Sequence, residues 1–456
     1  MKLSKAMKSF LAATMVTTMA VSMVGCGGKT EAPATTPAAG SSKEEAKEET
    51  KEEAKAEPVT VDIFQFKVEI AEELQKAIDL YTSNNPNVTI NLQTVGGGDD
   101  YGAAQRALFQ SGQEPTIFNV GGPQDVTDWK EYLEDLSDQP WVSTAGTTLG
   151  AVTEDGKIYG MPFAVEGYGL AYNKEIFETA GVDVTSIKDL ASMDAAFAAL
   201  DAKIKSGELK DKYPNLEAVV EMPAKELWVM GLHASNLFLN QEFATGMDAF
   251  KAKEVNFTKS ADYKTYMDMM IKYSPNAATP AKANAVDYAT QVDQGIALER
   301  VAAVQQGNWI YGGVKNVDPA VADKLGFLPV PGDSIPLGVP MYWAVNSQKS
   351  DAEKQAAKDF LNWLYTSEEG KDIIVNKFFF VPPFTGYDNY PAQDALGKAI
   401  MEYQAAGKTT PWVFMGYPTS WGEQVLGVNL QKYIGGESSW DEAIKASQDA
   451  WKESRQ

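Results

Sequence analysis

The sequence predicts an α/β fold that is large enough for two hydrophobic cores. The chain has 456 residues, of which 44% are hydrophobic, and this length suits two domains of ordinary size. Between residues 59 and 120, strand-like and helix-like segments follow one another in the order β-α-β-α-β. This alternation favours a mostly parallel sheet flanked by helices, with ligands bound at the loops that follow the strands.

Each of these five elements has its own pattern. Residues 59–64, 88–95 and 116–120 are expected to be strands, because apolar and β-branched residues dominate or alternate there. The two helices between them are indicated by apolar residues at helical spacing, which are Ile70, Leu74, Ala77, Ile78 and Tyr81 in the first and Ala103, Ala104, Ala107 and Leu108 in the second.

The loops that follow the three strands should meet at one edge of the sheet, and they are residues 65–67, 96–100 and 121–124. The second loop contains three glycines. It is not a Walker loop, because no Gly-Lys-Ser or Gly-Lys-Thr follows, and it is not a GxGxxG fingerprint. Asp99 and Asp100 beside the glycines accept hydrogen bonds either from a ligand or, as caps, from the backbone of the next helix.

Residues 1–25 have the layout of a signal peptide. Three lysines precede an apolar run that ends at Val24 and is too short to span a bilayer comfortably. Cys26, the only cysteine, follows in the string MVGC, which resembles a bacterial lipobox with methionine in place of the commoner leucine. This resemblance implies that residues 1–25 are cleaved off and that Cys26 is acylated, which would anchor the chain to a membrane. A free thiol is the alternative.

Residues 26–57 should connect that anchor to the folded part. Residues 27–42 are rich in Gly, Ala, Pro, Ser and Thr, which is typical of a flexible tether. Residues 43–57 contain lysines four apart with glutamates between them, and this pattern fits either a solvated helix or a disordered charged spacer. In both cases the segment would hold the folded part away from the membrane.

Composition excludes several classes of function. Loss of the three lysines in residues 1–25 would change the net charge from −22 to −25, which disfavours nucleic acid and anionic lipid as partners. The sequence contains no GxSxG or HExxH motif, and its single histidine excludes a two-histidine zinc site. We therefore expect no catalytic residues, metal or cofactor, with a surface glycoside hydrolase as the competing enzyme class.

One stretch carries a family resemblance. Residues 155–181, DGKIYGMPFAVEGYGLAYNKEIFETAG, resemble the extracellular solute-binding proteins of ABC importers, in the carbohydrate branch that includes maltose-binding protein. The string QGNW at residues 306–309 and the helix-like residues 361–370 support the resemblance, which covers residues 58–456. It implies two α/β lobes joined by three chain crossings at a hinge.

Carried onto this sequence, lobe one would comprise residues 58–165 and 334–384, and lobe two residues 168–332 and 386–456. The resemblance further implies a monomer, lipid-anchored on the extracytoplasmic face of the cell membrane. It would capture a sugar or oligosaccharide by hinge closure and deliver it to ABC importer permease subunits. The alternatives are the same fold with a peptide, polyamine or other polar or cationic solute, and a purely structural surface lipoprotein.

Sugar sites combine aromatic faces with carboxylates and amides, because sugars present both C–H faces and hydroxyls. The resemblance makes Trp309 a stacking residue, with a core tryptophan as the alternative. Of Tyr342 and Trp343 only one should face the cleft, since side chains alternate along a strand, and Trp343 is favoured. Trp421 is preferred to Trp412 in the string TTPWVFMGYPTSWGEQ.

Among the polar residues, Glu166 corresponds to the glutamate that accepts sugar hydroxyls at the family's hinge crossing. A structural salt bridge at the hinge is its alternative role. Further candidates are Asp99, Asp100, Asn119, Gln124, Asn308, Glu226 and, among the aromatics, Trp228. His233 lies among apolar residues and is expected to be an interior residue.

Overall fold

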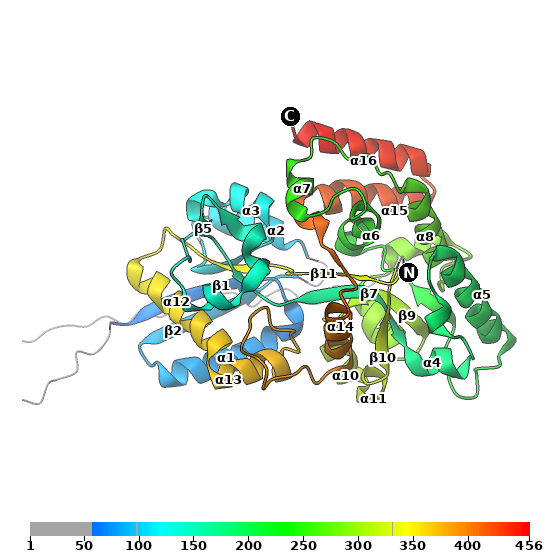
Figure 1. The fold of residues 1–456 in the computed structure, drawn as a ribbon, viewed down its shortest axis with the longest axis horizontal. Helices are drawn as coiled ribbons and strands as arrows, with labels where there is room; N and C mark the ends of the chain where they lie inside the picture. Colours follow the sequence, from blue (N-terminus) through cyan, green and yellow to red (C-terminus); the bar gives the residue numbers. More distant parts are fainter. Residues whose placement is uncertain (1–56, 97–98, 331) are drawn as a thin grey trace, which may run out of the picture. The chain divides into compact units, whose positions relative to one another are not determined.

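The computed structural model describes residues 57–96, 99–330 and 332–456. Residues 1–56 lie outside the described residues. They comprise the expected signal peptide, Cys26 and the expected tether up to residue 56. Two β-sheets organise the rest, each covered by helices on both faces (Figure 1). We call the layers around the first sheet lobe one and those around the second sheet lobe two.

Lobe one is built on a five-stranded sheet in the order β2-β1-β3-β12-β6. Its strands are β1 (Val59–Gln65), β2 (Val88–Thr94), β3 (Ile117–Val120), β6 (Met161–Pro162) and β12 (Tyr342–Val345). Side chains of α1 (Ala71–Asn84) and α12 (Asp351–Thr366) pack on one face of this sheet. Side chains of α2 (Tyr101–Gln110) and α3 (Pro123–Asp128) pack on the other.

Lobe two is built on a six-stranded sheet in the order β13-β11-β7-β9-β8, with β10 also paired to β7. Its strands are β7 (Glu166–Asn173), β8 (Ala218–Glu221), β9 (Val301–Gly307), β10 (Leu325–Leu328), β11 (Ile335–Gly338) and β13 (Thr409–Pro411). The larger cluster on this sheet includes side chains of α5 (Leu190–Ser206), α8 (Ser260–Lys272), α15 (Val428–Gly435) and α16 (Trp440–Ser454). A second cluster includes side chains of α10 (Ile310–Val317) and α14 (Ala395–Ala405).

Shorter elements complete the described chain. The remaining α-helices are α4 (Lys174–Thr179), α6 (Ser235–Leu239), α7 (Gly246–Lys251), α9 (Tyr288–Gln291), α11 (Pro319–Ala322) and α13 (Glu368–Asp372), and short 3-10 and π-helical segments lie between the elements. A separate two-stranded sheet joins β4 (Thr153–Glu154) to β5 (Lys157–Ile158). Two π-helical segments, Val229–Ala234 and Trp421–Gly427, lie against each other in lobe two.

The α/β class is confirmed, but the sheets are mixed rather than mostly parallel. The strand β1 runs parallel to β2 and β3, as the alternation predicts, whereas β12 is antiparallel to β3. In lobe two, β7 is antiparallel to its neighbours β9, β10 and β11. The antiparallel pairs arise where the chain crosses between the lobes. A strand that enters a lobe from the hinge runs in the opposite direction to a neighbouring strand that returns to the hinge.

The hinge is the place where segments from distant parts of the sequence meet. The strand β7 begins at Glu166, which pairs with Gly338 at the end of β11. One residue earlier, the Val165 N–H donates to the Val381 carbonyl at 2.8 Å. The crossing from β11 to β12 falls at residues 339–341, a few residues after the boundary expected at 332–334.

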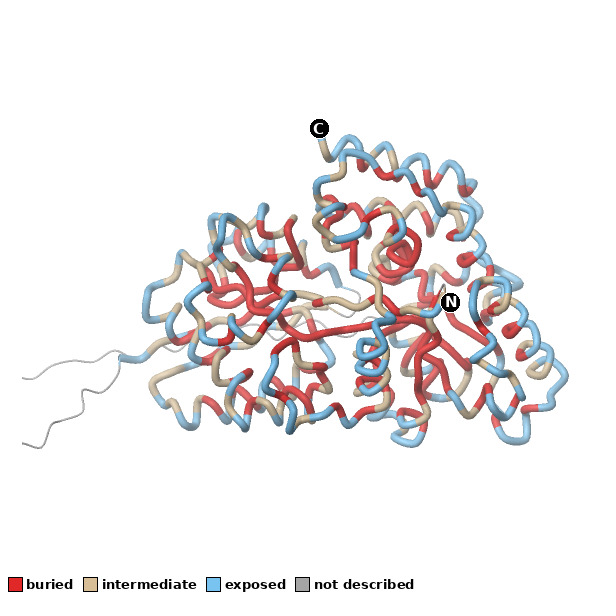
Figure 2. Tube along the Cα trace, viewed as in Figure 1, coloured by how far each residue is buried: buried red, intermediate tan, exposed pale blue. Residues whose placement is uncertain are grey.

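Burial agrees with this layering. The central strands of both sheets are buried, while one side of most helices is exposed (Figure 2). All eight residues of β7 are buried, which fits its central place in the second sheet. Within the described ranges, every helix is too short or too polar to cross a bilayer.

Candidate ligand-binding site

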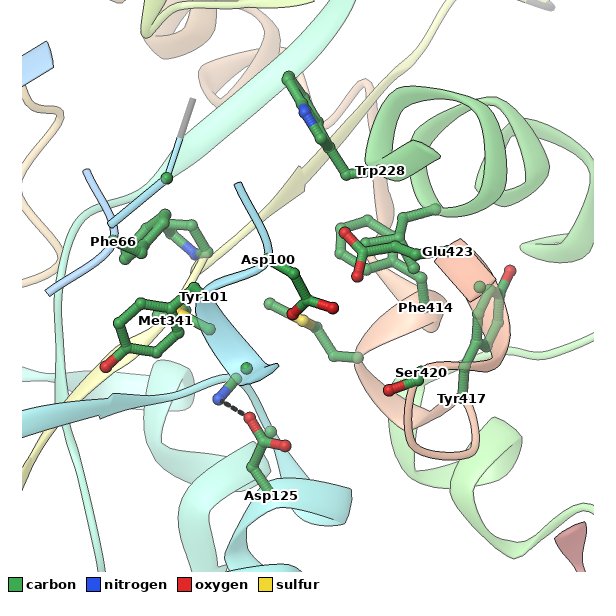
Figure 3. Close-up of a pocket in the computed structure, with 18 of the residues that line it drawn as sticks. Phe66, Asp100, Tyr101, Asp125, Trp228, Met341, Phe414, Tyr417, Ser420 and Glu423 are labelled. Carbon is green, nitrogen blue, oxygen red and sulfur yellow. Dashed lines mark hydrogen bonds between the residues drawn. The ribbon is translucent and has the colours of Figure 1, made fainter. Parts of the chain in front are cut away.

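A cavity of about 370 Å³ lies at the edge of the first sheet, and residues of both lobes line it (Figure 3). Lobe one contributes residues from all three loops that follow β1, β2 and β3, among them Lys67, Asp100 and Gln124. Lobe two contributes residues from the two π-helical segments, Tyr288 of α9, Trp309 after the end of β9, and residues from the segment 412–420. The cavity is therefore at the position where an α/β sheet binds ligands.

The lobe-two wall is an aromatic cluster around His233. The imidazole stacks on Tyr168 at a centroid distance of 4.3 Å. The rings of Trp228, Trp309, Trp412 and Phe414 lie within 5.1–5.7 Å of it. Burial lowers the pKa of His233 to about 3, so the ring is neutral at physiological pH. His233 is 7% exposed, and its ring nitrogens form no hydrogen bond with any described residue.

The hinge side of the cavity holds a buried ion triad. The Lys67 ammonium lies 2.6 Å from Glu166 and 2.6 Å from Glu69, and the Lys67 and Glu166 side chains are only 3% and 5% exposed. Burial alone would lower the pKa of Lys67, but the two carboxylates raise it above its usual range. Burial raises the pKa of Glu166, and Lys67 opposes that rise. The triad joins the loop after β1 to the first residue of β7.

The opposite end of the cavity is acidic. Asp125 accepts a hydrogen bond from the Gly121 N–H at 2.6 Å, and burial raises the pKa of its carboxyl to about 6. Burial and then the neighbouring Asp100 raise the pKa of Glu423 to about 7, against the opposing effect of Arg106. Asp100 also caps α2, because its side chain accepts the Ala103 N–H.

Six of the residues expected at the site line the cavity, and they are Glu166, Trp309, Asp99, Asp100, Gln124 and Trp228. The Trp309 indole N–H donates to Gln306 at 2.8 Å, which fixes the orientation of the ring. The Trp228 indole N–H donates to Glu226 at 3.0 Å. Glu166 and Asp100 each line the cavity and also make a structural contact. Glu166 forms the ion pair with Lys67 at the hinge, and Asp100 caps α2, so the ligand-facing position and the structural role occur together in both residues.

The three aromatic residues Tyr342, Trp343 and Trp421 lie in the cores instead. Trp343 stacks on Phe163 and donates to the Tyr365 hydroxyl at 2.9 Å. Tyr342 points to the opposite face of the sheet, where its hydroxyl donates to the Thr148 carbonyl at 2.6 Å. The alternation along β12 therefore distributes the two rings between two cores, and the linker residues Pro340 and Met341 line the cavity in their place.

Trp421 is 1% exposed, and its indole N–H donates to the Ser447 carbonyl at 2.8 Å. It packs inside lobe two because it begins a π-helical segment whose inner face is apolar. The neighbouring Trp412, which we rank lower from the sequence, lines the cavity.

Three buried polar candidates support the cavity wall from behind. The Asn119 side chain accepts the Phe66 N–H, and the Asn308 side chain accepts the Gly167 N–H. Glu226 accepts both the Trp228 indole N–H and the Tyr288 N–H. Each therefore holds a backbone or a ring that borders the cavity, and none of the three is in the lining itself.

Several lining residues were not expected from the sequence. They include Arg106, Asp125, His233, Tyr288, Phe414, Tyr417 and Glu423. Phe414, Tyr417 and Glu423 belong to the string TTPWVFMGYPTSWGEQ, from which we predicted Trp421 as a site residue. The sequence thus identified the segment that borders the cavity, but not which of its side chains face the cavity. Across the described ranges, no group of three His, Cys, Asp or Glu residues is arranged to hold a metal ion.

A family comparison decides the class of this protein. A model of bacterial extracellular solute-binding proteins matches residues 76–402. The chain belongs to this family. Its members are binding proteins and not enzymes, so the glycoside hydrolase alternative is set aside, and the family is extracytoplasmic. The resemblance drawn from the sequence is confirmed.

Curated relatives of this solute-binding protein are sugar-binding proteins by name. The melibiose/raffinose/stachyose-binding protein of Bacillus subtilis (strain 168) is 23% identical over 60% of this chain and 63% of the relative. The multiple sugar-binding protein of Streptococcus mutans is 22% identical over 62% of this chain and 64% of the relative. The matched part of the chain thus spans slightly less than two thirds of these relatives.

Solved structures share the fold over most of the chain. A chitin oligosaccharide-binding protein superposes with a TM-score of 0.73 at 22% identity, covering 87% of this chain and 99% of the other. A solute-binding protein in complex with raffinose superposes with a TM-score of 0.67 at 14% identity, covering 87% of this chain and 100% of the other. The two-lobed α/β solute-binding fold is therefore shown.

Proposed function

We propose that this solute-binding protein binds a sugar or oligosaccharide in the cavity between its lobes. The observation that carries the proposal is the composition of the lining, in which aromatic rings from lobe two face carboxylates and amides from lobe one. Sugars need both kinds of surface, because their C–H faces lie on aromatic rings and their hydroxyls need donors and acceptors. The names of the curated relatives support this ligand class.

The lining suggests a division of roles. Trp228, Trp309 and Trp412 would stack on sugar faces, and the neutral His233 would exchange a hydrogen bond with one hydroxyl. Asp100 and Gln124 would accept or donate hydrogen bonds from lobe one. Glu166 would bind ligand with the carboxylate capacity that its ion pair with Lys67 leaves free.

Closure of the lobes would couple binding to transport. Ligand that contacts both lobes favours the closed arrangement by its higher affinity for it. Residues near 166, 338–341 and 381–386 would form the hinge between the two lobes. The closed protein would then deliver its ligand to the permease subunits of an ABC importer.

Membrane attachment would come from acylated Cys26, with residues 27–57 as the tether. Each buried methylene of an acyl chain contributes about 0.8 kcal/mol, so two or three chains would hold the protein stably at the membrane. The captured solute would thus stay close to the permease.

Isothermal titration calorimetry with a panel of neutral di- to tetrasaccharides tests the ligand class. We expect at least one to bind with a dissociation constant near the micromolar range, which corresponds to about −8 kcal/mol. Trp309→Ala should weaken that binding by about tenfold, because a stacking ring is lost. Trp363→Ala, which removes a half-buried tryptophan outside the cavity, is the matched control and should leave affinity unchanged.

Thermal melts should first show that both variants are folded. Equal affinity of wild type and Trp309→Ala for every bound sugar would refute the stacking role. Binding of a peptide or polyamine in place of any saccharide would refute the ligand class while leaving the fold assignment intact.

A further inference from the structure

Charge is distributed unequally over the cavity lining. Six carboxylates contribute, from Glu69, Asp99, Asp100, Asp125, Glu166 and Glu423, against two basic side chains, Lys67 and Arg106. Lys67 is bound on both sides by Glu69 and Glu166. Among the described lining residues, this leaves Arg106 as the one basic group for the other four carboxylates, which we call the acidic end.

The acidic end is assembled from both lobes. Asp99 and Asp100 precede α2, Asp125 lies on α3, and Glu423 comes from the π-helical segment of lobe two. Figure 3 shows the Asp100 and Glu423 carboxylates reaching into the same part of the cavity. Adjacent to Glu423, the Gln424 side chain is 3.5 Å from Asp100, which places the two lobes in contact here. None of the four carboxylates is ion-paired with a described residue.

The surrounding groups compensate little of this charge. Arg106 lies near Asp125 and Glu423, but burial still raises the pKa of Asp125 to about 6 and that of Glu423 to about 7. Arg455, outside the lining, donates to Gln124 and to the Gly416 carbonyl. A buried carboxylate without a counter-charge is relieved by a proton or by a cation, whereas a neutral hydroxyl leaves its charge uncompensated.

A second feature of the same cavity points independently to a ligand. Trp412, which packs beside His233, is 6% exposed and lines the cavity, and its buried indole N–H has no hydrogen-bond partner among the described residues. A polar group so deeply buried requires a partner, and a ligand would supply one. The rings around His233 suit both sugar faces and positive charge, because the faces of aromatic rings attract cations.

We propose that the ligand is an amine-bearing saccharide, whose ammonium group binds between Asp100 and Glu423 while a sugar face stacks on the rings around His233. This inference rests on the proposed function and narrows it to a class of saccharide. It also disfavours acidic sugars, because their carboxylates would face a lining that holds six carboxyl groups and only two basic side chains among its described residues.

Three trimers with the same β-1,4-linked backbone provide the test, because they differ at carbon 2 alone. They are the trimers of glucose, of glucosamine and of N-acetylglucosamine. Calorimetry with the whole mature chain at pH 6 should show the glucosamine trimer binding at least about tenfold more tightly than the other two. This preference should decrease as salt is added, since screening weakens charge pairing.

Isosteric variants locate the ammonium site. Glu423→Gln should reduce severalfold the ratio of the affinity for the glucosamine trimer to the affinity for the glucose trimer. Asp100→Asn should do the same, and because asparagine also caps helices it keeps the start of α2 intact. Glu402→Gln removes an exposed carboxylate on α14, outside the cavity, and should change neither affinity.

The possible outcomes separate the two proposals. If the glucose trimer binds as tightly as the glucosamine trimer, the inference is overturned and the proposed function stands. If a preference for glucosamine is unchanged in both carboxylate variants, the assigned ammonium site is overturned. If spermidine binds and no saccharide does, or if nothing binds, both the proposed function and the inference fall.

Discussion

At the residue scale, the structure shows buried polar groups whose roles depend on their partners. Lys67 and Glu166 satisfy each other across the hinge. Glu221 on β8 is also buried, but its Oε2 atom has no hydrogen-bond partner among the described residues. A carboxyl group in that position is favoured in its neutral form.

Glu221 should therefore make stability depend on pH. Burial raises the pKa of its carboxyl to about 7 from an ordinary value of 4.5, so the folded protein holds a proton that the unfolded chain has released. The free energy of unfolding then falls as the pH rises from about 5 to 8. Glu221→Gln avoids that loss, and its stability relative to wild type should improve by on the order of 2 kcal/mol over this range.

Urea denaturation at pH 5 and at pH 8 measures this difference. Glu178→Gln, which changes an exposed carboxylate on α4, should show no comparable change between the two pH values. A difference between Glu221→Gln and wild type that stays constant with pH would contradict the assignment of a raised pKa.

At the element scale, the cavity depends on two π-helical segments packed closely together. A Cβ atom on Gly231 would lie 1.6 Å from the Gly422 carbonyl oxygen, so the two backbones approach at a distance that only glycine allows. The first segment carries His233 and follows Trp228, and the second carries Glu423. Their contact thus sets the spacing between the aromatic cluster and the acidic end.

Gly231→Ala should consequently weaken both folding and binding. The added methyl group must push the segments apart, which we expect to cost about 1–3 kcal/mol of unfolding free energy and to lower saccharide affinity. Gly150→Ala is the control, because no atom lies within 4 Å of its added Cβ, and it should change stability by less than about 0.5 kcal/mol. Equal urea midpoints for the two variants would contradict the close-packing argument.

Periodicity predicted the elements better than the side chains that face the cavity. The strands β1, β2 and β3 and their following loops were predictable, because local patterns determine them and all three loops line the cavity. The placement of His233 and Glu423 toward the cavity was not predictable. Both lie in π-helical segments, which depart from the period of 3.6 residues that is used to predict which side of a helix a residue occupies. The antiparallel pairing of β7 also depends on long-range crossings that local patterns do not encode.

At the scale of the whole molecule, the cavity is lined by residues that lie far apart in the sequence. The lining begins at Phe66 and ends at Glu423, with contributions from both lobes. The proposed lipid anchor, Cys26, precedes these residues in the sequence, so we propose that solute capture and membrane attachment are independent, and this can be tested directly.

Cys26→Ser should abolish membrane retention and leave saccharide affinity unchanged. Serine cannot form the thioether through which the cysteine would carry its acyl chain, whereas the nearest lining residue is forty positions later in the sequence. Fractionation of a bacterial host that expresses the whole chain measures the first effect, and calorimetry the second. Ser41→Ala, a change within the tether, should stay with the membrane. Retention of Cys26→Ser in the membrane fraction would exclude acylation as the anchor, and a change in affinity would show that the anchor and the cavity are not independent.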